Sequence, residues 1–95
     1  MTEKTLRQQI IALLEGQAMD ARALSTALSV KEKEIYDHLA HVERTVISGG
    51  RRFNIHPSRC IACGYVFEKR KRLTRPSRCP QCKSSRLSQP FFEIQ

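Results

Sequence analysis

The sequence predicts an α+β fold in which three helices are followed by a two-stranded antiparallel hairpin, with a metal-binding segment between the two strands. Three observations favour it. Apolar residues recur at helical spacing in the first half, and residues 52–56 and 91–94 alternate polar and apolar. Four cysteines form two Cys-x2-Cys pairs between these stretches. A chain of 95 residues buries only a small core, so we expect a metal or a partner to stabilise it.

The helices are predicted from the apolar periodicity of the first half. The first is expected to begin near Thr2 and to end at residue 16, with apolar residues every three or four positions. Asp20 is a favourable N-cap for a short second helix. Residues 29–30 interrupt the pattern before a third helix over residues 31–47. A tight turn between the last two is the layout of a helix-turn-helix, although any small helical bundle has similar stripes.

The two alternating stretches are expected to pair as the wing that follows the third helix in a winged helix-turn-helix. Residues 17–19 can add a third short strand. We therefore expect residues 1–56 and 91–95 to form a winged helix-turn-helix, and residues 57–90 to form a zinc ribbon inserted in its wing.

The four cysteines Cys60, Cys63, Cys79 and Cys82 are the expected metal ligands. Two Cys-x2-Cys turns brought together place four thiolates at tetrahedral corners, which suits Zn²⁺. Two disulfides are the alternative, but the N-terminus has no apolar signal core, and cytoplasmic thiols stay reduced. Four protein ligands leave no position for a substrate, so the site is expected to be structural. The spacing admits iron as well as zinc.

Two stretches of the sequence resemble known families. Residues 60–67, Cys-Ile-Ala-Cys-Gly-Tyr-Val-Phe, with residues 79–83, Cys-Pro-Gln-Cys-Lys, resemble the knuckles of a rubredoxin-like zinc ribbon. Residues 20–30, followed by Ile35 and residues 38–39, resemble the helix-turn-helix of winged-helix regulators. The whole plan is similar to small predicted prokaryotic transcriptional regulators, best known from archaea, that combine both units. That resemblance implies a DNA-binding regulator with structural zinc.

Rubredoxins carry iron in this kind of site and transfer electrons, so an electron carrier is one alternative function. Two features of the sequence argue against it. The ribbon is rich in arginine and lysine, and it occupies only about a third of the chain.

Charge is distributed unevenly along the chain, whose formal net charge is +8. Residues 1–50 carry 6 basic and 7 acidic side chains, whereas residues 51–95 carry 11 basic and 2 acidic ones. Such an asymmetry favours a polyanionic partner, although a basic run is also typical of a solvated loop. The expected nucleic-acid contacts of this half are Arg51, Arg52, Lys69, Arg70, Lys71, Arg72 and Arg75.

The predicted third helix departs from the usual basic recognition helix. Lys33 and Tyr36 near its start are candidate contacts to DNA. However, Glu32, Glu34 and Asp37 lie in the same turns and disfavour an approach to phosphates. The sequence therefore favours binding led by the wing or the ribbon.

Catalysis is not expected, because the sequence has no nucleophile–base pair, no paired carboxylates and no phosphate-binding glycine loop. The longest apolar run has five residues, so no membrane span is expected, and we predict a cytoplasmic location. DNA is the expected partner. RNA and a protein of the transcription machinery are the alternatives, and a homodimer is left open.

Overall fold

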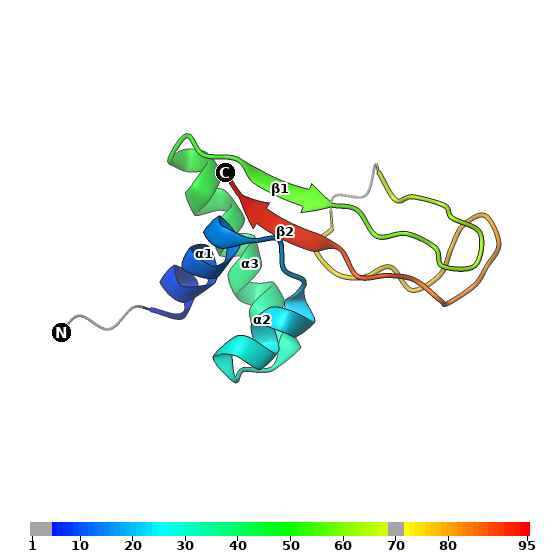
Figure 1. Ribbon diagram of the computed structural model, residues 1–95, viewed down its shortest axis with the longest axis horizontal. Coiled ribbons are helices and arrows are strands. Elements are labelled where there is room, and N and C mark those ends of the chain that lie inside the picture. The colour runs from blue at the N-terminus through cyan, green and yellow to red at the C-terminus, as the bar shows by residue number, and fades with distance from the viewer. Residues whose placement is uncertain (1–4, 69–71) are drawn as a thin grey trace.

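The structure is a computed structural model that describes residues 5–68 and 72–95. The elements in chain order are α1 (Leu6–Gly16), α2 (Ala21–Leu28), α3 (Glu32–Ser48), β1 (Phe53–His56) and β2 (Phe91–Ile94). The three helices gather at one end, and the chain between β1 and β2 extends away from them as an arm (Figure 1). The predicted α+β class, with three helices and a two-stranded sheet, is confirmed.

Helix α1 begins later than the sequence analysis predicted. Thr5 is its N-cap, because the Thr5 hydroxyl accepts from the backbone N–H of Gln8 at 3.2 Å. The Gln8 side chain in turn accepts from the N–H of Thr5 at 2.9 Å, which completes a capping box. The predicted start near Thr2 was therefore wrong, since this reciprocal pair fixes Leu6 as the first helical residue.

The turn between α2 and α3 matches the expectation. Asp20 caps α2, as its carboxylate accepts from the N–H of Ala23 at 2.7 Å. Ser29 ends α2 in the left-handed conformation, with φ of 57°. Helix α3 follows from Glu32 and ends at Ser48, shifted by one residue from the predicted range at each end.

The sheet places β2 between two partners. Phe53 of β1 lies opposite Ile94, in an antiparallel register. On the other edge, Met19 forms a bridge with Phe92 through two backbone hydrogen bonds of 3.0 and 2.8 Å. The third strand expected around residues 17–19 is thus a single bridging residue, and it ties the α1–α2 connection to the sheet.

Two separate cores stabilise the chain. The larger one joins the three helices to β2, whose Phe92 and Ile94 are almost fully buried in it. The smaller one contains Cys60, Cys79 and Leu87, with Phe67 packed against them. Strand β2 therefore packs with the helices, and the arm has few apolar side chains of its own. The residues of the larger core are Ile10, Leu14, Ala21, Leu24, Ile35, Leu39, Val42, Val46, Phe92 and Ile94.

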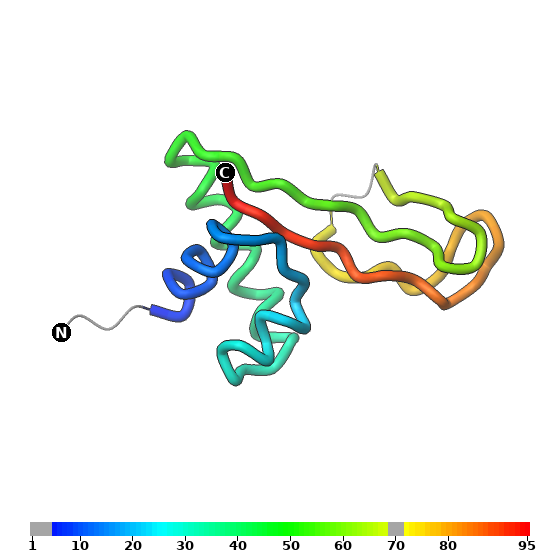
Figure 2. The backbone as a smooth tube through the Cα atoms, in the orientation of Figure 1, coloured from blue at the N-terminus to red at the C-terminus, as the bar shows by residue number. Residues whose placement is uncertain are grey.

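The hairpin continues beyond the sheet into the arm without a change of register. Cys60, seven residues after Phe53, lies opposite Leu87, which is seven residues before Ile94, the partner of Phe53. The same register sets Pro57 opposite Pro90, where the ladder is interrupted. Figure 2 shows the two chain segments running side by side from the sheet into the arm. The arm is therefore an extension of the hairpin, and it carries the cysteines away from the helices.

Among residues 5–68 and 72–95, no helix combines the length and the apolar character needed to cross a lipid bilayer.

Candidate metal centre and basic surface

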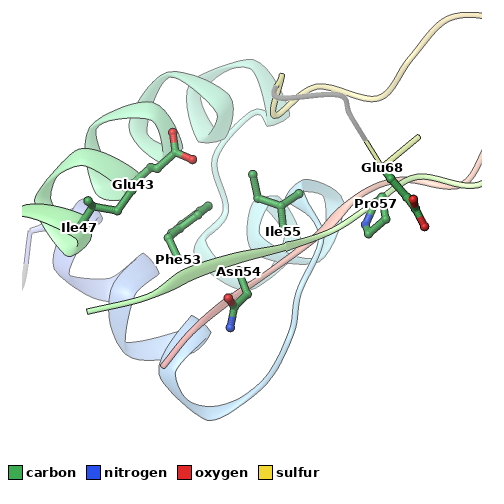
Figure 3. Close-up of a pocket in the computed structure, with 7 residues that line it drawn as sticks. All are labelled: Glu43, Ile47, Phe53, Asn54, Ile55, Pro57 and Glu68. Atoms are coloured by element: carbon green, nitrogen blue, oxygen red, sulfur yellow. The ribbon is translucent and has the colours of Figure 1, made fainter. Parts of the chain in front are cut away.

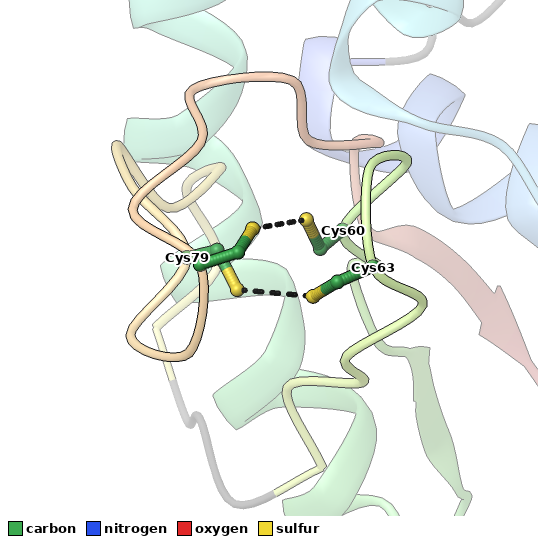
Figure 4. A group of neighbouring side chains, drawn as sticks. Cys60, Cys63 and Cys79 are labelled. Carbon is green, nitrogen blue, oxygen red and sulfur yellow. Dashed lines mark hydrogen bonds between the residues drawn. The ribbon is translucent and has the colours of Figure 1, made fainter.

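The four cysteine sulfurs converge at the far end of the arm, within 4.8 Å of one another. The Sγ atoms of Cys60 and Cys82 are 3.5 Å apart, and those of Cys63 and Cys79 are 3.6 Å apart (Figure 4). A regular tetrahedron with metal–sulfur bonds of 2.3 Å has edges of about 3.8 Å. The cluster therefore fits a tetrahedral metal with four thiolate ligands, and both zinc and iron accept this donor set.

Each cysteine pair is built on the same backbone turn. The N–H of Gly64 donates to the carbonyl of Cys60 at 2.9 Å, and the N–H of Lys83 donates to the carbonyl of Cys79 at 2.9 Å. Both donors adopt left-handed backbone angles, with φ of 83° for Gly64 and 64° for Lys83. The first turn uses the residue that tolerates this conformation best, whereas the second forces a side chain into it.

In each pair one cysteine has a lowered pKa and the other a raised one: hydrogen bonds among the sulfurs raise the pKa of Cys63 and Cys82, whereas that of Cys60 and Cys79 is lowered. Burial raises the pKa of Cys60, but hydrogen bonds from the backbone N–H of Cys63 and from a neighbouring thiol outweigh it and lower the pKa to about 7. For Cys79, burial is likewise outweighed by backbone N–H donors, including Gln81 at 3.4 Å from the sulfur, and the pKa is lowered. Two sulfurs that ionise readily are suited to begin capture of a metal cation.

The basic residues at the base of the hairpin differ in their availability. Arg51 forms an exposed ion pair with Glu15 of α1, with 3.0 Å between nitrogen and oxygen. Arg52 is exposed and joins the C-terminal residue Gln95 through its backbone, which leaves its guanidinium to solvent. The predicted contacts Lys69, Arg70 and Lys71 lie outside the described residues.

Residues 72–75 of the loop between the two cysteine pairs lie against α3. Leu73 packs on the helical core. The backbone N–H of Arg75 donates to the phenolic oxygen of Tyr36. A cleft of about 660 Å³ lies between this loop and α3 and includes Arg72 and Asp37 in its walls. The physical reason is the burial of Leu73, the apolar residue within a charged stretch.

Tyr36 supports this loop, and its contact with DNA stays a prediction. Its ring is half-buried against the helical core, and burial, reinforced by the nearby carboxylate of Glu32, raises its pKa. It anchors the loop by accepting from Arg75. Lys33, the other candidate on α3, remains exposed.

A second cleft, of about 750 Å³, lies between α3 and β1 and was not anticipated from the sequence. Phe53 and Ile55 extend from β1 on the side of α3, where Ile47 and Glu43 face them (Figure 3). The strand alternation did place Phe53 and Ile55 on one face. The alternation could not show that Ile47 lies opposite them. The Ile47 side chain is 58% exposed near the end of α3.

Comparison with known proteins agrees with both halves of this description. Residues 5–54 match the family described as PF0610-like, N-terminal, and residues 57–95 match the PF0610 rubredoxin-like zinc beta-ribbon domain. The solution NMR structure of protein PF0610 from Pyrococcus furiosus is similar over 100% of this chain and 95% of that one, with 27% identity and a TM-score of 0.80. No curated protein matches the chain. The chain therefore belongs to the PF0610-like family, and its four cysteines are positioned for metal binding in a rubredoxin-like zinc ribbon.

Proposed function

We propose that the protein binds duplex DNA as a transcriptional regulator, with a winged helix-turn-helix body and a structural zinc ribbon in its wing. The order of the elements supports this, because three helices, a bridge at Met19 and the β1–β2 hairpin are the parts of a winged helix. The observation that carries the proposal is the hairpin itself. It continues in register into an arm within a half of the chain that has 11 basic and 2 acidic residues.

The proposed binding mode is led by the arm and the hairpin. Helix α3 presents Glu34 and Asp37 to solvent, and both repel phosphates. The segment of Leu73 and Arg75 also lies over part of its surface, at Tyr36. Arginines outside α3 must then neutralise the phosphates, and each contact releases counterions from the DNA.

The metal has a structural part in this mechanism. When bound, it cross-links the two turns of the arm. The residues that hold it are the four cysteines, and its coordination is complete with them. In the described part of the arm, the apolar side chains packed around the cysteines are Leu87 and Phe67. Burial of apolar side chains therefore stabilises the arm only weakly. The metal is thus expected to supply much of the folding free energy of the arm.

A salt titration of the zinc-loaded chain with a mixed-sequence duplex tests this proposal by fluorescence anisotropy. We expect binding at low salt and a linear loss of log affinity with log salt. Arg52→Gln should reduce the slope by about one unit. The matched variant Lys33→Gln, on α3, should leave the slope unchanged. No binding at low salt would end the proposal, and a slope that changes only with Lys33 would move the contact to α3. A single-stranded RNA that competes better than the duplex would instead favour an RNA-binding protein.

The acidic surface of α3 favours a second candidate function, which is docking of a basic protein. Glu34 and Asp37 are exposed on it, in a chain whose formal net charge is +8. An adaptor of this kind would retain a protein partner during purification after nuclease treatment. Loss of that partner in Asp37→Asn, with an unchanged affinity for the duplex, would assign α3 to the protein and the arm to DNA.

A further inference from the structure

The first cysteine turn carries an exposed apolar side chain at the end of the arm. Ile61, between Cys60 and Cys63, is 61% exposed. Tyr65, four residues later, is 37% exposed. Its ring meets the ring of Phe67 edge-on, with ring centroids 5.0 Å apart. Figure 1 shows that the cysteine turns lie at the end of the arm away from the helices. Ile61 is therefore an exposed aliphatic side chain at the tip of the arm, accessible to a molecule that docks there.

The register of the arm determines the neighbours of Ile61. Cys60 lies opposite Leu87 and both are buried, so the residues on either side of them face outward. The N–H of Ile61 donates to the carbonyl of Arg86 at 2.9 Å, which places these two residues opposite each other. Arg59 lies two positions before Ile61 on the same face, and both arginines are exposed.

The charges around Ile61 identify the chemistry of the partner. Among the described residues of the arm, Glu68 is the one acidic side chain, and neither Arg59 nor Arg86 forms an ion pair with a described residue. Side chains opposite each other in an antiparallel ladder have Cβ atoms about 5 Å apart, so an arginine adjoins the isoleucine directly. Minor-groove binders combine arginines with an inserted apolar side chain, which is the arrangement at Ile61.

We propose that Ile61 is a wedge that enters the minor groove of duplex DNA and partly separates a base step, while Arg59 and Arg86 hold the flanking phosphates. This deepens the proposed DNA binding and rests on it. A metal held by Cys60 and Cys63, on either side of Ile61, would give the wedge a rigid base. Pyrimidine–purine steps are the most easily unstacked, so the wedge predicts a preference for DNA that contains them.

The test uses the zinc-loaded full chain and a duplex that carries 2-aminopurine at a central TA step. Binding of the natural protein should increase the 2-aminopurine fluorescence, because unstacking relieves its quenching. Ile61→Ala should remove that increase and weaken binding about tenfold, with an unchanged salt slope because no charge is lost. Ile47→Ala is the matched control, since that isoleucine is 58% exposed on α3. It should retain both the fluorescence and the affinity.

Three results would overturn the inference. The first is a bound duplex in which the fluorescence of 2-aminopurine does not rise. The second is equal affinity of Ile61→Ala and Ile47→Ala for the duplex. The third is an effect of Ile61→Ala that is seen only with a protein partner or with RNA. Each of these leaves arm-led binding to DNA intact. Absence of any duplex binding at low salt overturns the proposed function together with the wedge. Arg86→Gln should lower the salt slope by about one unit, and an unchanged slope would remove this arginine from the phosphates.

Discussion

Replacement of Gly64 by alanine tests whether the cysteine turns are built as described. Gly64 has φ of +83°, and a Cβ added there meets no atom within 4 Å. The cost therefore comes from the backbone conformation and not from a clash. A residue with a side chain is less stable in the left-handed region by about 1–2 kcal/mol. The reduced freedom of the unfolded chain returns about 0.4–1 kcal/mol. We expect a net loss near 1 kcal/mol, which corresponds to about fivefold weaker metal binding.

The assay is competition for zinc between the protein and a chromophoric chelator under reducing conditions. Lys83→Gly is the reciprocal variant, because Lys83 holds the same place in the second turn with φ of 64°. It should bind zinc as tightly as the natural protein or more tightly. Gly16→Ala is the control, since Gly16 also has open space around it but lies in α1 without a positive φ. Equal zinc affinity in Gly64→Ala and Gly16→Ala would refute the reasoning.

Three further predictions concern the coupling of the arm to the helices. Cys63→Ser should abolish metal binding and leave most of the helical circular dichroism, because the two cores are separate; loss of the whole helical signal would contradict this. Leu73→Ala should lower the thermal stability of the helical body by about 1–2 kcal/mol, as expected for a half-buried leucine, and an unchanged melting curve would remove the loop from α3. Tyr36 has a raised pKa, so its contribution to stability is complete below its unfolded pKa near 10 and falls as the pH rises through the folded value. Denaturant titrations at high pH should show this decline in the natural protein and a smaller one in Tyr36→Phe.

The features that local sequence dictates were predicted well. The cysteine ligands follow from two short turns of fixed spacing, which place sulfurs on one side whatever the rest of the chain does. Strand β2 has the predicted bounds, since Phe91–Ile94 alternates between an exposed and a buried face. Asp20 caps α2 as expected, because a carboxylate three residues before a free N–H needs no distant partner.

The features that depend on distant contacts were not predicted. A single apolar residue, Leu73, sets the path of the inter-cysteine loop, and one residue has no periodicity to reveal its partner. The helical pattern likewise cannot show that a segment almost 40 residues later covers part of Tyr36. The start of α1, by contrast, depends on local residues. Thr5 and Gln8 form a capping box whose pattern is present in the sequence, and apolar periodicity alone does not locate it.

The most direct test of the central claim is a duplex-DNA binding isotherm of the full chain with its metal in place and after its removal under reducing conditions. Four thiolates and one Zn²⁺ together contribute −2, so the metal-free chain, with its formal charge of +8, is the more basic form. Attraction by charge alone therefore predicts that it binds at least as tightly. Binding led by a metal-stabilised arm predicts the opposite: one metal per chain, much weaker binding without it, and full recovery when zinc is returned. A metal-free chain that binds the duplex as well as the loaded one would contradict it.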